Sequence, residues 1–149
     1  MTASASNRPL SIGGRTLWQA AGITAVAAVV IDLIIFSTAA AIWDVPGDFS
    51  QINVASVIVI PIVSIIIAAI GLAVVAHFSE RPLTIFTVLA VIVTILSLSS
   101  PITATTSGMS GQDPVTTSTF ITMLILHLVT GSLIAFGFPA LLRRTKLDV

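Results

Sequence analysis

Residues 52–78 read INVASVIVIPIVSIIIAAIGLAVVAHF and contain no Asp, Glu, Lys or Arg. An α-helix needs about 20 apolar residues to cross the ~30 Å hydrocarbon layer of a bilayer, so this run is long enough to span a membrane. Its apolar residues do not alternate with polar ones, as they would in a strand of a membrane barrel. The segment therefore predicts a transmembrane α-helix.

Three more runs of the same kind occur along the chain, each bounded by charged, Gly or Pro residues. The short connections make sequential helices antiparallel neighbours, so the sequence predicts an all-α, integral membrane four-helix bundle with no separate soluble domain. Residues 1–15 are expected to form a flexible cytoplasmic tail and residues 143–149 a basic one. The predicted helices are 16–43, 52–78, 83–102 and 116–142.

The composition excludes several classes of protein. Of 149 residues, 56% are hydrophobic and 8% charged, whereas a soluble domain is about a quarter charged. The formal net charge of zero provides no basic surface for nucleic acid. Because the chain has no cysteine, it has no disulfide, thiolate metal site or Cys nucleophile. The expected partners are the lipid bilayer and a second copy of the chain or a larger membrane complex.

The basic residues predict an orientation. If the amino terminus is cytoplasmic, every Lys and Arg lies in an inside segment, and the outside loops carry Asp44, Asp48 and Asp113 instead. The positive-inside rule then favours a multi-pass protein of the cytoplasmic (inner) membrane with both termini cytoplasmic, N-in/C-in. The six basic residues are Arg8, Arg15, Arg81, Arg143, Arg144 and Lys146.

The first run has a rival interpretation as a signal peptide, since Arg15 precedes it and small residues follow at its end. The run is longer than the usual apolar core of a signal peptide and contains Asp32. We therefore expect an uncleaved span.

Asp32 is the only charged side chain deep in a predicted span, about 16 Å below the outer end of its helix. An unpaired, ionised Asp at this depth costs about 2.5–3.5 kcal/mol, so it should face protein, be protonated or have a partner. It shares one helical face with a stripe of small residues, typical of helix contacts in membranes. That stripe consists of Ala21, Ala25, Ala28 and Ala39.

His127 is the predicted partner of Asp32, because it lies at a similar depth in the fourth predicted helix. Gly131 and Ala135 share its face and would allow a close approach between helices. The other helices bring hydroxyls to the same layer through Ser64, Thr94 and Ser97. Pro61 frees a backbone carbonyl and predicts a helix kink nearby.

Two interpretations of this polar layer compete. In the favoured one, the side chains form a hydrogen-bond network that fixes helix register. In the other, Asp32 and His127 form a proton or ligand site, as ionisable residues do in transporters. One His and one Asp are too few for a metal site, and no cofactor is expected.

Four stretches together resemble an uncharacterised bacterial family, the domain of unknown function six-zero-six-nine: the run Thr16–Phe36 with its polar Asp32, the segments Glu80-Arg81-Pro82 and Leu96–Pro101, and the run 123–128 (MLILHL). The resemblance extends over about residues 16–144 and implies a four-helix prokaryotic membrane protein. Members tend to carry Asn where this chain has Asp32, a difference that favours a structural role for this side chain. The resemblance implies no activity, substrate or cofactor.

Three classes of function remain open. The leading one is a membrane protein without catalytic machinery, either an accessory subunit or a homo-oligomeric component. The alternative is a small proton-coupled transporter or channel that uses Asp32 and His127. An enzyme is not expected, because the sequence has no nucleophile–base pair, metal cluster or phosphate-binding loop.

Overall fold

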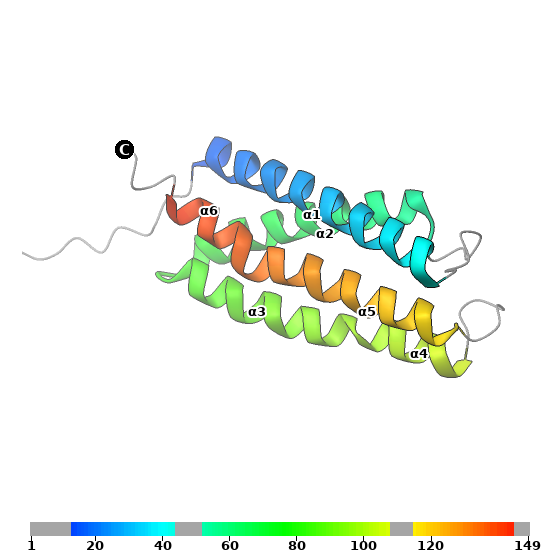
Figure 1. Cartoon of the computed structure of the whole chain (residues 1–149). Coiled ribbons are helices and arrows are strands. Elements are labelled where there is room, and N and C mark those ends of the chain that lie inside the picture. Colours follow the sequence, from blue (N-terminus) through cyan, green and yellow to red (C-terminus); the bar gives the residue numbers. More distant parts are fainter. Residues whose placement is uncertain (1–12, 44–51, 108–114, 145–149) are drawn as a thin grey trace, which may run out of the picture.

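The computed structural model describes residues 13–43, 52–107 and 115–144, and all regular structure within these ranges is helical. Four helices are long and apolar enough to cross a membrane (Figure 1). The prediction of an all-α chain with four such helices is therefore confirmed. The predicted outer-loop residues Asp44, Asp48 and Asp113, and most of both tails, lie outside the described residues. The four spans are Gly14–Trp43, Val54–Phe78, Pro82–Thr105 and Thr117–Arg144.

Two spans are single α-helices, and the other two are divided. The third continues beyond the predicted end at Ile102, with an interruption at Leu98. Pro101 is tolerated because it falls in the first turn of the following helix, where its missing N–H is not needed. The elements are α1 (Gly14–Trp43), α2 (Val54–Phe78), α3 (Pro82–Ser97), α4 (Ser99–Ser107), α5 (Thr117–Ser132), the π-helical η1 (Leu133–Gly137) and α6 (Phe138–Arg144).

Local sequence explains where the helices begin. Asn53 and Ser56 form a capping box at the start of α2: the Ser56 backbone N–H donates to Asn53 Oδ1 at 2.9 Å, and the Asn53 N–H donates to Ser56 Oγ at 3.0 Å. Pro82 opens α3, where a fixed φ favours helix. Thr116 caps α5 by accepting from the Thr119 N–H.

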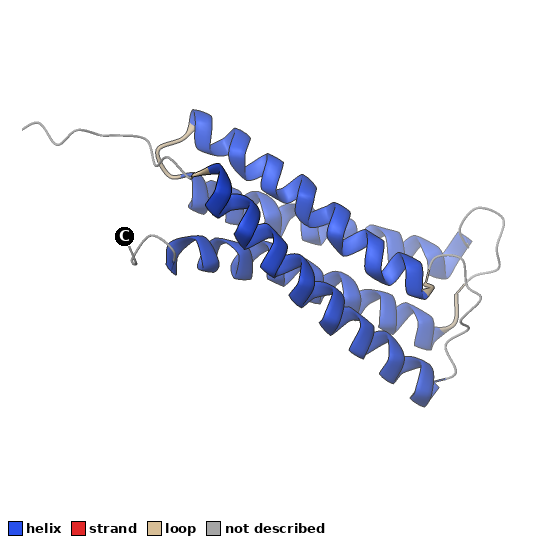
Figure 2. Cartoon of the chain, turned by 90° about the horizontal axis from the view of Figure 1, so that it is seen from above, coloured by secondary structure: helices blue, strands red, loops and turns tan. Residues whose placement is uncertain are grey.

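The spans form a ring in which α1 contacts α2 and α5, while α3 contacts α2 and α5 on the other side. Figures 1 and 2 show that the start of α1, the α2–α3 connection and the end of α6 lie at one end of the bundle. We call this the basic end, because it carries Arg15, Arg81, Arg143 and Arg144.

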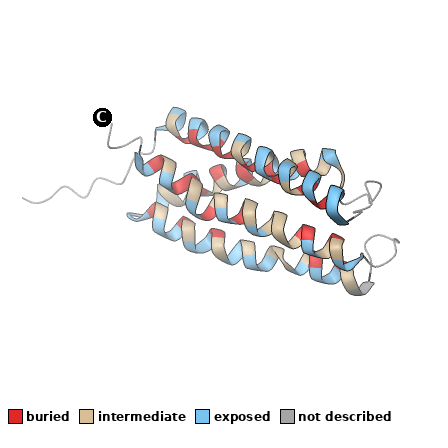
Figure 3. Ribbon diagram, viewed as in Figure 1, coloured by how far each residue is buried: buried red, intermediate tan, exposed pale blue. Residues whose placement is uncertain are grey.

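Buried residues follow the inner faces of the helices, and the outer faces are exposed and apolar (Figure 3). The core has two clusters. The larger one includes residues of the basic end, such as Leu72 and Phe138, and the smaller one joins Phe36, Val57 and Met123 toward the other end. Along α1, Asp32 lies one turn from Ala28 of the first cluster and one turn from Phe36 of the second.

Candidate functional site

Asp32 is buried in the middle of α1, with 3% of its surface exposed. Ala21, Ala28 and Ala39 are buried along the same helix. Asp32 thus faces protein, in agreement with the small-residue stripe in the sequence. A buried carboxyl group in this position depends on polar groups supplied by neighbouring helices or by molecules in the space beside it.

The hydrogen-bond partner of Asp32 is Thr130 of α5, whose Oγ1 donates to Asp32 Oδ2 at 2.6 Å. The sequence predicts His127 as the partner, within direct or water-mediated reach; the direct bond that the structure shows comes from Thr130 instead, and the role of His127 stays a prediction. The two candidates lie three residues apart on one helix, so both face the same way, and depth alone does not separate them. Thr130 was missed, although a hydroxyl one turn beyond His127 was the signal that could have identified it.

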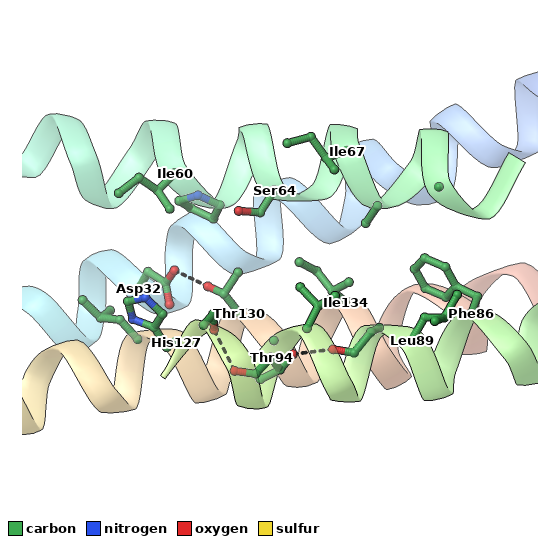
Figure 4. A pocket seen from close by; sticks show the side chains of 18 of the residues that line it. Asp32, Ile60, Ser64, Ile67, Phe86, Leu89, Thr94, His127, Thr130 and Ile134 are labelled. Carbon is green, nitrogen blue, oxygen red and sulfur yellow. Dashed lines mark hydrogen bonds between the residues drawn. The ribbon is translucent and has the colours of Figure 1, made fainter. Parts of the chain in front are cut away.

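The other carboxyl oxygen, Asp32 Oδ1, is buried and has no hydrogen-bond partner within the described part of the chain. A buried polar atom without a partner is uncommon in native structures and is a reason to look for a functional role. His127 lies close enough to interact electrostatically with Asp32, and Figure 4 shows the two side chains side by side.

His127 hydrogen-bonds within its own helix: Nδ1 lies 2.8 Å from the Met123 carbonyl oxygen. A carbonyl oxygen only accepts, so Nδ1 must carry the proton and donate. In the neutral imidazole this leaves Nε2 as an acceptor with a free lone pair. The local bond thus fixes the tautomer.

A cavity of ≈ 690 Å³ lies between α2, α3 and α5, with Asp32 of α1 in its wall (Figure 4). Its lining is mostly aliphatic, including Ile60, Ile67 and Leu89. The cavity lining also includes Pro61 and all five residues predicted for the polar layer: Asp32, Ser64, Thr94, Ser97 and His127.

The hydroxyl groups of the polar layer differ in whether they already donate a hydrogen bond within the protein. Thr94 Oγ1 donates to the Ala90 carbonyl at 2.8 Å, and Ser97 Oγ donates to the Thr94 carbonyl at 2.7 Å. These bonds satisfy the hydroxyls within α3. Ser64 lines the cavity, and its side-chain hydroxyl makes no hydrogen bond within the described part of the chain. The kink predicted at Pro61 stays a prediction, and α2 continues as one helix through that residue.

Gly131 allows α5 to approach α3. A Cβ atom at Gly131 would lie 2.5 Å from Thr94 Oγ1 and 2.9 Å from Thr94 Cβ. Gly131, which the sequence predicts to allow a close helix contact, therefore makes that contact with α3, beside the cavity.

A second interhelical hydrogen bond joins α3 to the fourth span: Thr87 Oγ1 donates to the Ala135 carbonyl at 3.1 Å. Pro139 has no N–H and cannot supply the helical bond that this carbonyl would receive from four residues later. The backbone forms a π-turn here, in which the Phe138 N–H donates to the Leu133 carbonyl. The Thr87 hydroxyl thus replaces the donor that Pro139 removes.

No group of three or more His, Cys, Asp or Glu residues that could hold a metal ion occurs in ranges 13–43, 52–107 and 115–144. The sequence model of a family of unknown function, DUF6069, matches residues 13–145 and confirms the resemblance found in the sequence. No curated protein and no solved structure matches the chain.

Proposed function

The chain belongs to the DUF6069 family of unknown function, and we propose that it is a non-enzymatic membrane protein that binds a small ligand in the cavity beside Asp32. The observation that carries this proposal is the buried Asp32 Oδ1, an acceptor without a protein partner in the cavity wall. Ligand pockets typically have volumes of about 300–1,000 Å³, with apolar walls and a few polar groups that fix orientation. The cavity fits this description.

The proposed topology is N-in/C-in in the cytoplasmic membrane of a bacterium. It is supported by the four described Arg residues at the basic end and by the positive-inside rule. Because the chain has no cysteine, single cysteines can report sidedness. Ser50→Cys and Gly108→Cys should react with an impermeant thiol reagent in intact cells, and Thr145→Cys should not. Labelling of Thr145→Cys would reverse the proposed orientation.

A second candidate is the accessory or homo-oligomeric membrane subunit favoured by the sequence. The hydrogen bond from Thr130 to Asp32 supports it, because such a bond between α5 and α1 fixes helix register without any ligand. The two candidates differ in one respect. Ligand binding requires that the cavity accept molecules from outside, whereas a structural network does not.

Thiol reactivity inside the cavity tests this difference. Ser64→Cys places a thiol in the cavity wall, and Ile66→Cys places one about 3 Å away in depth on the outer face of α2, where Ile66 is 42% exposed and does not line the cavity. Methyl methanethiosulfonate attacks thiolates, which form poorly in hydrocarbon.

In lipid nanodiscs, we expect Ser64→Cys to be modified about tenfold faster than Ile66→Cys, as a hydrated cavity favours the thiolate. Intact-protein mass spectrometry gives both rates. Equally slow modification of the two variants would reject the ligand-binding proposal and favour the structural subunit. A transporter would additionally carry the ligand across proteoliposomes, with Asp32 and His127 exchanging protons.

A further inference from the structure

The charge and hydrogen-bonding groups of the cavity indicate which ligand it can hold. The Lys and Arg residues that the structure describes all lie at the basic end of the bundle, away from the middle of α1: Arg15, Arg81, Arg143 and Arg144. Within the described part of the chain, Asp32 therefore has no Lys or Arg near it with which to form an ion pair. A cation that completes this site must come with the ligand.

The hydrogen bonds already made determine what such a cation must donate. Thr130 uses its only hydroxyl proton on Asp32 Oδ2, which leaves Oδ1 as an acceptor. His127 uses Nδ1–H on the Met123 carbonyl, which leaves Nε2 as an acceptor in the neutral ring. With Asp32 ionised and the His127 ring neutral, these two side chains offer one anionic and one neutral acceptor, and Thr130 has no hydroxyl proton left to donate. A group with a positive charge and at least two N–H bonds complements both.

The remaining cavity wall sets the character of the ligand body. It is formed mostly by aliphatic side chains, with Phe86, Met123 and a few hydroxyl-bearing residues among them, and its volume of ≈ 690 Å³ suits a small organic molecule. Ile67 of α2 and Val93 of α3, which line the cavity, are 64% and 63% exposed on the outside of the bundle. The cavity therefore borders on the lipid between these helices.

From these groups we propose that the cavity binds a protonated primary or secondary amine on an apolar body, with the ammonium group between Asp32 Oδ1 and His127 Nε2. The ligand reaches the cavity from the bilayer, between α2 and α3. This assignment rests on the proposed ligand-binding function and names the chemical class of its ligand. A quaternary ammonium ion has the charge without the N–H bonds, and an alcohol of the same shape has a donor without the charge.

Protection of Ser64→Cys from methyl methanethiosulfonate tests the assignment, with 1-naphthylmethylamine, its N,N,N-trimethyl analogue and 1-naphthalenemethanol as probes. The three are compared at equal membrane-bound concentration in uncharged nanodiscs. We expect the amine to slow modification about tenfold and the other two less than about twofold, since a charge-assisted hydrogen bond is lost in each. The protection should disappear in Ser64→Cys/Asp32→Asn.

The possible failures are separable. If unprotected Ser64→Cys is no more reactive than Ile66→Cys, the cavity is closed and both proposals fall. If Ser64→Cys reacts and the alcohol protects as well as the amine, the cavity binds ligands but the assigned class is wrong. Equal protection by the trimethyl analogue would refute the requirement for N–H donors. This comparison is made on the chain with Asp32 intact, so it does not depend on the folding of the Asn variant.

Discussion

The basic end of the bundle and its middle differ in how the helices are held together. At the basic end, Leu72 and Phe138 are fully buried, and the rings of Phe86 and Phe138 pack edge to face with centroids 5.8 Å apart. Farther along the bundle, a cavity of ≈ 690 Å³ separates α2, α3 and α5, with Phe86 in its wall toward the basic end, and in the middle the hydrogen bond from Thr130 to Asp32 links α5 to α1.

This difference shows where stability and function are located. Lipid tails are as apolar as leucine, so helices in a bilayer associate through close packing and interhelical hydrogen bonds. The packed basic end supplies close packing, whereas beside the cavity the bond from Thr130 to Asp32 joins two helices and Asp32 Oδ1 keeps no partner within the described residues. The middle of the bundle can therefore serve a ligand while the basic end holds the helices together.

The largest expected effect comes from removing a packed ring. Phe138→Ala should lower the free energy of unfolding by about 3–5 kcal/mol, because the fully buried ring leaves a cavity that its neighbours cannot fill. Titration with sodium dodecyl sulfate in mixed micelles, followed by circular dichroism, measures this loss.

The matched control is Ile67→Ala at the edge of the cavity, where the side chain is 64% exposed. A change within about 0.5 kcal/mol is expected there. Similar losses in the two variants would mean that the middle of the bundle is as tightly packed as the basic end, and the contrast between them would fail.

An intermediate effect is expected at the contact of α5 with α3 beside the cavity. Gly131→Ala should lower the free energy of unfolding by about 1–3 kcal/mol, since the added Cβ overlaps the Thr94 side chain and forces the helices apart. Thr94→Ala in the same chain should recover part of this loss in the same titration. If the double variant loses as much as the sum of the two single variants, Thr94 is not what opposes a side chain at residue 131.

The smallest effect is expected at Asp32 itself. Asp32→Asn keeps an acceptor for the Thr130 hydroxyl, so the free energy of unfolding should change by about 1 kcal/mol or less. The elution volume in detergent should be unchanged. A loss as large as that of Phe138→Ala would show that the carboxylate holds the bundle together and would move the source of stability to the middle.

The four spans were predictable because their length and apolarity are properties of the sequence itself. The burial of Asp32 was predictable too, since the alanines that share its helical face mark a contact surface. Its partner was not. Residues His127 and Thr130 differ in depth by about 4.5 Å, and the rotation of α5 and the side-chain rotamers decide which of them reaches the carboxyl group.

The cavity could likewise not be predicted from the sequence, although the polar residues that line it could. Whether a layer of polar side chains closes into a network or surrounds a space depends on how far the helix axes separate, which the residue pattern does not encode. The local bonds of Thr94 and Ser97 to their own helix are one reason that the layer does not close.

The bond from Thr87 to the Ala135 carbonyl has a consequence for biogenesis. A fourth span alone in lipid would lack the Thr87 hydroxyl as a donor to this carbonyl, and neither Pro139 nor hydrocarbon replaces it. The third span brings the missing donor and precedes it in synthesis. We therefore expect the last span to be more stable in the membrane once the third span, which is synthesised before it, lies beside it.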